Sequence, residues 1–374
     1  MNSNKTYLQV DVILLILLGG ILTIGLLAVS STTQARFGNF QPFLIKQAGA
    51  AVVGGVAAWW IWRWDYHFLP QISKYIYIVN IGLLAAVLVL GHSALGAQRW
   101  IGLGPITIQP SETAKLLSIL TLAVALDRQE RFDRWTDLAP ALLHILPAFG
   151  LIFLQPDLGT ALVFVVTLFA MLYAAGYPGW KLSLIGGIGL AIIVGWIVLH
   201  LRYHVKIPLK EYQLDRLIVF MDPQVDPSGL GYQISEAKVA IGTGGLFGQG
   251  LFHGVITHLN YLPEQFTDFI FSSISEELGF LGAGTLLLGF ALLLSRIFRI
   301  AALARDRLGT LLAVGVGTML AFHIVENVGM NLSLMPVAGI PLPFVSYGGS
   351  AMAMNVTAMG VVLSVWRHHR EIQF

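Results

Sequence analysis

The stretch Leu262-Pro263-Glu264-Gln265-Phe266-Thr267-Asp268-Phe269-Ile270-Phe271 joins a long polar segment, at about residues 200–268, to an apolar run at about 269–294. It therefore places a carboxylate, that of Asp268, at the mouth of a predicted membrane helix. Charged groups are costly near hydrocarbon and are retained mainly where something uses or pairs them. The stretch predicts a membrane protein that carries out chemistry at a membrane surface.

The rest of the chain is predominantly apolar. Of its 374 residues, 56% are hydrophobic and 11% are charged, whereas soluble domains carry about 25% charged residues. Apolar runs close to the ~20 residues needed to span a bilayer recur along the chain. Ten runs are expected to be transmembrane helices, at about 11–30, 43–62, 75–92, 112–126, 139–154, 158–175, 182–200, 269–294, 309–328 and 350–366. We therefore predict an all-α polytopic membrane protein that forms a single domain over residues 1–374.

The distribution of Lys and Arg predicts the orientation, because short cytoplasmic loops are enriched in these residues. With the N-terminus inside, the inner connections hold most of these cations, and the short outer connections hold only Arg36, Lys46 and Arg99. Both termini are therefore expected to be cytoplasmic. The 200–268 segment, between predicted helices 7 and 8, is expected to be a large extracytoplasmic loop. Within it, Tyr232 to Ile241 resembles an amphipathic interfacial helix.

Four extracytoplasmic segments are rich in polar residues, Gly and Pro. They lie at about 96–115, 155–160, 200–268 and 335–350. Irregular backbone at membrane depth is tolerated only where it is buried in protein or lines a wet cavity, so we expect the four to converge on one outward cavity. ATP is scarce outside the cell, and the chain has no G-x-x-x-x-G-K-[ST] motif. Chemistry there would need a substrate that is already activated.

Asp268 is the strongest candidate for a catalytic residue. Thr267 is a plausible N-cap, which would place Asp268 in the first turn of the eighth helix. Ser272 and Ser275 follow on the same helical face and would form a polar stripe facing a wet cavity. An acidic residue that merely favours the helix dipole is the alternative, but that alternative leaves the stripe unexplained.

Glu112 and Lys115 are three residues apart on one predicted helix and can pair. Two interpretations stay open and are about equally favoured. The pair is either a structural ion pair that keeps a buried lysine charged, or a site in which Lys115 offers its charge to a phosphate in the cavity.

Two other features favour a structural interpretation. Asp157 opens the sixth predicted helix and is interpreted first as a structural N-terminal acid, with a site role second. The glycine-rich segment 242–250 lacks the strand–helix context of a phosphate-binding loop, so we interpret it as a tight turn at the membrane surface.

Three cations on the outer side, Arg99, Arg216 and Lys238, could bind an anionic lipid headgroup. For each of them alone, snorkelling to the lipid surface is the better interpretation. His323 and Glu326 could suit a metal or a proton relay, but a buried hydrogen-bonded pair is favoured. The chain has no cysteine, and no cluster has the ligand count of a zinc site, so no metal ligands are predicted.

Several motifs together resemble the SEDS family (shape, elongation, division and sporulation), and they occur in that family's order over nearly the whole chain. They are Arg99-Trp100 with Gln109-Pro110-Ser111-Glu112, Gln155-Pro156-Asp157-Leu158-Gly159, Asp222-Pro223 with Asp226-Pro227-Ser228-Gly229-Leu230-Gly231-Tyr232-Gln233, Leu262-Pro263-Glu264 with Thr267-Asp268-Phe269-Ile270-Phe271, Glu276-Glu277-Leu278-Gly279 and Pro343-Phe344-Val345-Ser346-Tyr347-Gly348-Gly349-Ser350. Phe252-His253-Gly254 and the 335–343 segment are more similar to the elongation type, RodA, than to the division type, FtsW.

The resemblance implies a peptidoglycan glycosyltransferase in the bacterial cytoplasmic membrane. Such an enzyme polymerises lipid II, a polyprenyl-pyrophosphate disaccharide-pentapeptide, at the outer face during elongation and rod-shape maintenance. Asp268 matches the family's essential acidic residue and would act as a general base. The candidate substrate-binding residues are Arg99, Glu112, Lys115, Asp157, Arg216, Lys238 and Ser346.

The resemblance also implies a set of partners. These are membrane lipid, a class B penicillin-binding protein and other cell-shape machinery, with no nucleic acid. No cofactor is firmly expected, although a divalent cation, Mg²⁺ or Mn²⁺, could meet the charge of the leaving group. Two alternatives stay open: a transporter that flips lipid II, and a non-catalytic scaffold that activates the penicillin-binding protein. The chain shows no inverted repeat, which weakly disfavours the transporter.

Overall fold

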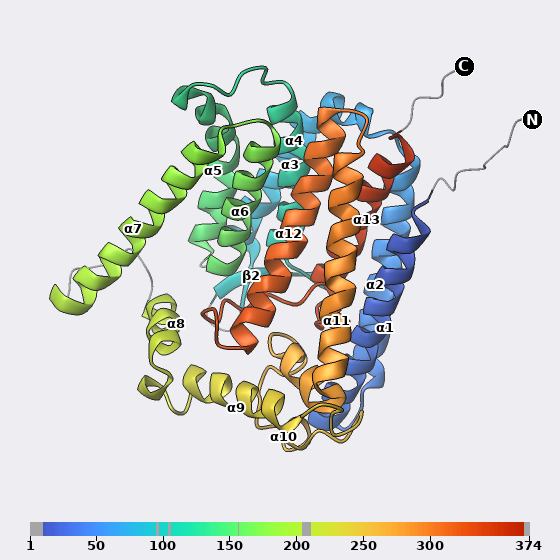
Figure 1. The fold of residues 1–374 in the computed structure, drawn as a ribbon, viewed down its shortest axis with the longest axis vertical. Coiled ribbons are helices and arrows are strands. Elements are labelled where there is room, and N and C mark those ends of the chain that lie inside the picture. Colours follow the sequence, from blue (N-terminus) through green and yellow to red (C-terminus); the bar gives the residue numbers. More distant parts are fainter. Residues whose placement is uncertain (1–9, 95–96, 104–105, 156, 204–210, 370–374) are drawn as a thin grey trace, which may run out of the picture.

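The computed structural model describes residues 10–94, 97–103, 106–155, 157–203 and 211–369, and it is a helical bundle (Figure 1). Each of the ten predicted apolar runs coincides with one helix. These helices are α1 Val12–Phe37, α2 Gln41–Arg63, α3 Leu69–Leu90, α4 Pro110–Asp127, α5 Ala139–Leu154, α6 Leu158–Ala174, α7 Gly179–Tyr203, α11 Ile270–Ala302, α12 Arg307–Asn331 and α13 Gly349–Arg367. The predicted all-α polytopic fold is confirmed.

Among the described residues, eight helices are long and apolar enough to cross a membrane. The two others of the predicted ten are α6, which has 17 residues, and α4, which contains Glu112, Lys115 and Asp127. The count of ten spans therefore stays a prediction. The start of α1 and the end of α13 lie at one end of the bundle, and helices of the 200–268 segment lie at the other (Figure 1). That arrangement agrees with the predicted separation of the termini from the large loop.

In the described part of the 200–268 segment, three helices and a short 3-10 turn follow α7. They are α8 Glu211–Met221, η3 Pro223–Val225, α9 Leu230–Thr243 and α10 Val255–His258. The predicted helix at 232–241 lies within α9, which buries Ile234 and Ala237 against Leu262 and Phe269 in a small second core. Whether α9 lies in the membrane interface stays a prediction. Two further 3-10 turns, η1 Tyr66–Phe68 and η2 Trp135–Leu138, precede α3 and α5.

Three short strands, which the sequence analysis did not predict, form an antiparallel sheet before α4. They are β1 His92–Ala94, β2 Ala97–Leu103 and β3 Ile106–Ile108, in the order β1-β2-β3. The second and third strands are rich in aromatic and β-branched residues, which favour strands. These strands are too short for an alternation of apolar and polar residues to be recognised within a polar segment.

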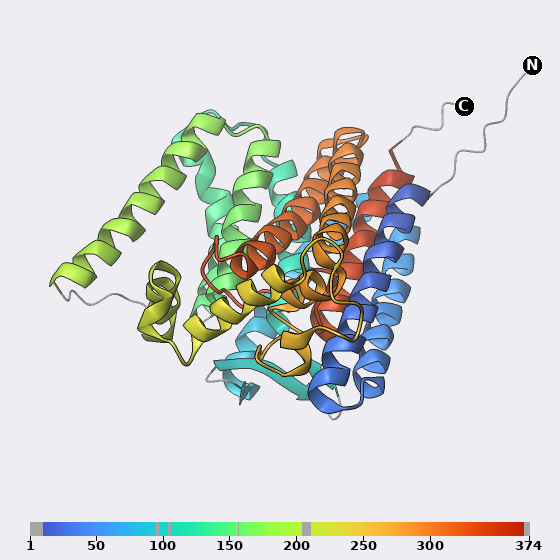
Figure 2. The same cartoon turned by 60° about the horizontal axis from the view of Figure 1, so that its bottom comes forward.

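The bundle is organised around α12, which packs against α4, α6, α11 and α13. A tight second pair is formed by α2 and α13, where small residues let the backbones approach. A Cβ atom at Gly360 would lie 2.5 Å from the Cα atom of Ala58. By contrast, α7 leans away from the bundle in both views (Figures 1 and 2).

The last architectural feature is a break in α11 at Gly279, whose φ is 67°. Here the glycine-rich turn docks, because the carbonyl of Glu277 accepts from the backbone N–H of Gly250 at 2.9 Å, and the N–H of Phe280 donates to Gly245 at 2.8 Å. A Cβ atom at Gly248 would lie 2.1 Å from the Glu277 carbonyl oxygen. The glycines of 242–250 therefore allow close backbone packing, which agrees with the predicted tight turn. The backbone groups of this turn also satisfy the groups that the break in α11 frees.

Candidate active site

Asp268 lies just before a helix rather than in its first turn. The helix α11 begins at Ile270, and Phe269, which has no side-chain polar group, takes the N-cap position. The predicted cap by Thr267 is therefore wrong. Its hydroxyl bonds instead to Glu264, donating to the carboxylate oxygen Oε2 at 3.0 Å. The chain turns tightly here, because the backbone N–H groups of Thr267 and Phe269 both donate to the Glu264 carbonyl.

Two asparagines of α12 fix the backbone of Asp268. Its carbonyl oxygen accepts from the side-chain amide of Asn327 at 2.9 Å and from that of Asn331 at 3.0 Å. The Asn331 oxygen in turn accepts from both the N–H and the hydroxyl of Ser272, at 3.1 and 2.6 Å. Ser272 and Ser275 are fully buried, so the predicted stripe facing a wet cavity is wrong. Ser272 belongs to the packing that positions Asp268.

The Asp268 side chain is half-buried and lies close to Gly339. Its Oδ2 atom lies 3.4 Å from the position that a Cβ atom would take at Gly339, and the Nη1 atom of Arg216 lies 3.8 Å from the same point. Arg216 also donates from Nη1 to the carbonyl oxygen of Ala338 at 2.9 Å. Gly339 has a φ of 72°, which disfavours a side chain there. A carboxylate and a guanidinium thus share the space left by a glycine.

The loop at 335–348 joins this site to its surroundings. The hydroxyl of Ser346 donates to the Thr267 carbonyl at 2.6 Å and accepts from the N–H of Leu342 at 2.8 Å. Because Ser346 is buried, its hydroxyl links two loops and does not form an open binding position. The next residue, Tyr347, donates from its N–H to Phe266 at 2.9 Å, and burial raises the pKa of its hydroxyl above the ordinary value.

The other segments that were predicted to be extracytoplasmic meet the same loop. Asp157 is the N-cap of α6 and accepts from the N–H of Thr160 at 3.2 Å, which confirms its structural interpretation. Beside it, a Cβ atom at Gly159 would lie 3.0 Å from the carbonyl oxygen of Ala338. At the start of α4, the N–H of Gln109 donates to the Ser350 hydroxyl at 3.1 Å. The four segments therefore meet around the 335–350 loop, as predicted, whereas an outward cavity between them stays a prediction.

The predicted pair of Glu112 and Lys115 is present and buried. The Lys115 ammonium lies 2.8 Å from Oε1 of Glu112, and it also lies 3.0 Å from Nε2 of His323 on α12. The favoured pairing of His323 with Glu326 is wrong. The Nδ1 atom of His323 and the Oε1 atom of Glu326 have no hydrogen-bond partner within the described parts of the chain.

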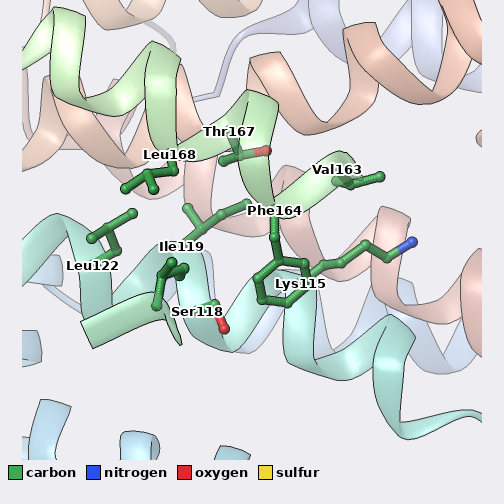
Figure 3. Close-up of a pocket in the computed structure, with 9 residues that line it drawn as sticks. Lys115, Ser118, Ile119, Leu122, Val163, Phe164, Thr167 and Leu168 are labelled. Carbon is green, nitrogen blue, oxygen red and sulfur yellow. The ribbon is translucent and has the colours of Figure 1, made fainter. Parts of the chain in front are cut away.

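The lysine stem borders a small pocket of about 10 Å³ between α4, α5 and α6. Its apolar lining includes Ile119, Leu122, Phe164 and Leu168. Figure 3 shows the stem beside Phe164 and the ammonium directed away from Leu122 and Leu168. The charged end of Lys115 is thus held by Glu112 and His323, whereas its methylene groups occupy an apolar environment, as is usual for a long basic side chain.

The remaining predicted cations are Lys238 and Arg99. Lys238 lies on α9 and is exposed. Arg99 lies in β2, and its side chain falls outside the described part of the structure. Over the residues that the structure describes, no three His, Asp or Glu side chains come close enough to hold a metal ion. A Mg²⁺ or Mn²⁺ requirement stays an expectation.

Sequence reasoning considered His323 only with Glu326, and it missed the roles of Asn327 and Asn331 on α12 in organising the site. His323, Asn327 and Asn331 are spaced four apart and thus lie along one helical face. The rise between His323 and Asn327 is about 6 Å, so the contact with Lys115 lies roughly one helical turn from the contact with Asp268. The signal was available, because polar residues at positions i, i+4 and i+8 of an apolar run mark a face that is packed in the interior.

Comparisons with known proteins bear on this arrangement. A family model described as cell cycle protein, which covers FtsW, RodA and SpoVE, matches residues 6–371. The chain belongs to this family. Stage V sporulation protein E of Bacillus subtilis is 39% identical over 99% of this chain and 100% of its own length. The peptidoglycan glycosyltransferase MrdB of Escherichia coli is 37% identical over 80% of this chain and 78% of its own length.

Solved structures in the FtsW/RodA/SpoVE family agree with the fold. The rod shape determining protein RodA of Thermus thermophilus matches with a TM-score of 0.72 and 30% identity, covering 98% of this chain and 99% of that one. A chain from a structure of a peptidoglycan synthase complex, described as coordinating polymerization and crosslinking, matches with a TM-score of 0.81 and 33% identity over 98% of this chain and 100% of that one. Family membership confirms the predicted glycosyltransferase class and the predicted multi-pass location in the cytoplasmic membrane.

Proposed function

We propose that this family member polymerises lipid II into glycan strands at the outer face of the cytoplasmic membrane. The observation that carries the proposal is the placement of Asp268. Its carboxylate is half-buried beside Gly339 and Arg216, its backbone is fixed by Asn327 and Asn331, and it lies toward the end of the bundle that carries the large loop. A fixed carboxylate and nearby cations suit a transfer reaction whose leaving group is anionic.

The proposed reaction is a single displacement. A sugar hydroxyl of the acceptor attacks the anomeric carbon of the donor, the bond to the pyrophosphate oxygen breaks, and the configuration at that carbon inverts. Asp268 accepts the hydroxyl proton as the new glycosidic bond forms. Arg216 and Lys115 meet the charge of the departing polyprenyl pyrophosphate, which an arginine fork and a lysine ammonium both suit. Since no described cluster fits a dedicated metal site, no step is assigned to a divalent cation.

The cellular role is proposed to be elongation and rod-shape maintenance. The motif at 252–254 and the 335–343 segment support it through their similarity to RodA, while relatives with sporulation and division names show how closely the types are related. A class B penicillin-binding protein is the proposed partner, supported by the likeness to a chain of a peptidoglycan synthase complex. Restoration of rod shape in a strain that lacks its elongation enzyme, and co-purification with such a transpeptidase, test these two points.

The decisive experiment measures glycan formation by the purified protein with labelled lipid II. Asp268→Asn nearly preserves shape but removes the basic carboxylate, so we expect a loss of about 10²- to 10⁴-fold in rate, with an unchanged melting temperature. Asp222→Asn is the matched control, because Asp222 is an exposed carboxylate of the same segment that only caps a turn. That variant should polymerise normally.

The same assay separates the alternatives. Normal polymer from Asp268→Asn would show that the assigned base is wrong. If the wild-type protein gives no polymer but moves lipid II across the membrane of lipid vesicles, the transporter is favoured. If it gives neither activity but stimulates a penicillin-binding protein, the scaffold is favoured.

A further inference from the structure

His323 is a buried histidine whose ring contacts the ammonium group of a lysine. Its side chain is 1% exposed, and its Nε2 atom lies 3.0 Å from the ammonium nitrogen of Lys115. Lys115 itself is buried and paired with Glu112 at 2.8 Å. A histidine in this position can neither form an ion pair with the lysine nor reach solvent, so its chemistry is restricted.

The contact determines the state of the imidazole ring. A lysine ammonium has three N–H donors and no acceptor, so Nε2 of His323 must accept the hydrogen bond. The ring is therefore neutral and carries its proton on Nδ1, an assignment that follows from the hydrogen-bond network. A neutral acceptor orients the ammonium without cancelling its charge, whereas Glu112 neutralises it. Among the described residues two of the three ammonium donors are thus engaged, and the third is left for another group.

The position of this contact relates it to Asp268. His323 lies one helical turn before Asn327, which donates to the Asp268 carbonyl at 2.9 Å. The helix α12 therefore contacts the backbone of Asp268 at one turn and the Lys115 ammonium at the next, with a rise of about 6 Å between Asn327 and His323.

We propose that His323 is a positioning residue for glycosyl transfer, which fixes the Lys115 ammonium so that its third N–H meets the leaving pyrophosphate of the donor. The proposal rests on the proposed function. A lysine has four rotatable methylene groups, and ordering it during the reaction would be unfavourable. An ammonium already oriented by Glu112 and His323 requires no reorganisation when charge develops on the leaving group.

The test compares two replacements that differ mainly in reach. In His323→Gln the side-chain oxygen extends to about the place of Nε2 and can still accept from Lys115. In His323→Asn the shorter amide reaches only the place of Nδ1, while the site stays polar and uncrowded. We expect His323→Asn to lose polymerisation on the order of 10²-fold, as for a misplaced catalytic group. His323→Gln should recover most of that loss.

A double-variant cycle supplies the second readout. If His323 acts through Lys115, adding His323→Asn to Lys115→Met should change the rate little further, because residues that act as a unit are not additive. His144→Asn is the matched control, since His144 contacts the Thr121 hydroxyl at 3.0 Å and lies on α5. It should polymerise at the wild-type rate.

The outcomes are distinguishable. Equal losses for the Gln and Asn variants, or additive losses in the Lys115→Met background, would overturn the positioning role. Wild-type rates for both variants would overturn it as well. A wild-type protein that makes no polymer would instead overturn the proposed function. If a His323 variant has a lowered melting temperature, the double-variant cycle decides the question. A purely structural defect would reduce the polymerisation rate further in the Lys115→Met background.

Discussion

Two apolar helices, α7 and α12, differ sharply in how much of each is buried in the protein. Both are long and apolar enough to cross a membrane, yet 6% of the most apolar window of α7 is buried in the protein against 72% for α12. The helix α12 carries His323, Asn327 and Asn331, all buried. The exposed face of α7 is formed by aliphatic residues such as Ile193 and Val194. Hydropathy therefore identifies a span, whereas polar residues within the span identify the helix that is packed inside.

Of the substitutions that compare these two helices, the largest effect should come from removing a polar contact of α12. Asn327→Ala strands the carbonyl group of Ile340 and leaves the Asp268 carbonyl with Asn331 as its remaining donor, since both carbonyls accept from Asn327 at 2.9 Å. We expect a loss of polymerisation on the order of 10²-fold, because the backbone of Asp268 is held by one asparagine instead of two. Stability should fall by about 1–3 kcal/mol, the usual cost of an unsatisfied buried group. Lipid II polymerisation and thermal unfolding in detergent measure both quantities.

The matched variant on the other helix is Ile193→Ala, which truncates a side chain that is 54% exposed. It should change neither the rate nor the melting temperature measurably. If Ile193→Ala were as damaging as Asn327→Ala, burial would not distinguish the two helices, and the contrast between them would be wrong.

An intermediate effect is expected from filling space beside glycines. A Cβ atom at Gly315 on α12 would lie 2.5 Å from Cγ2 of Ile119 and 3.0 Å from the sulfur of Met171. Gly315→Leu should therefore destabilise by about 1–3 kcal/mol, as overpacking does. Nothing lies within 4 Å of the corresponding position at Gly195 on α7, so Gly195→Leu should keep the wild-type melting temperature. Similar melting temperatures for the two leucine variants would contradict the difference in packing.

Much of the fold followed from the sequence, because apolar length is a local property. The pair of Glu112 and Lys115 was predictable for the same reason, since residues three apart on a helix are neighbours. The partner of His323 was not predictable, because Lys115 is 208 positions away and only packing brings α4 to α12. The same limit explains Ser272, whose hydroxyl bonds to Asn331 across two helices rather than lining a cavity.

The smallest effect concerns the cations of the large loop, where the contrast between packed and unpacked side chains recurs. Arg216 is half-buried, bonds to Ala338 and lies near the Asp268 carboxylate, whereas Lys238 is exposed on α9. Surface substitutions away from such contacts usually change stability by less than about 0.5 kcal/mol, so Lys238→Gln should keep the wild-type melting temperature, and we expect its polymerisation rate to change by less than about twofold. Arg216→Gln removes the same charge at a packed position, and it should reduce the rate well beyond that limit. Measuring both variants over a range of salt concentrations separates a local contact from general attraction of an anionic substrate, because screening weakens only the latter strongly. A large, salt-sensitive loss in Lys238→Gln would show that an exposed cation recruits the substrate, and that burial alone does not identify the residues that act.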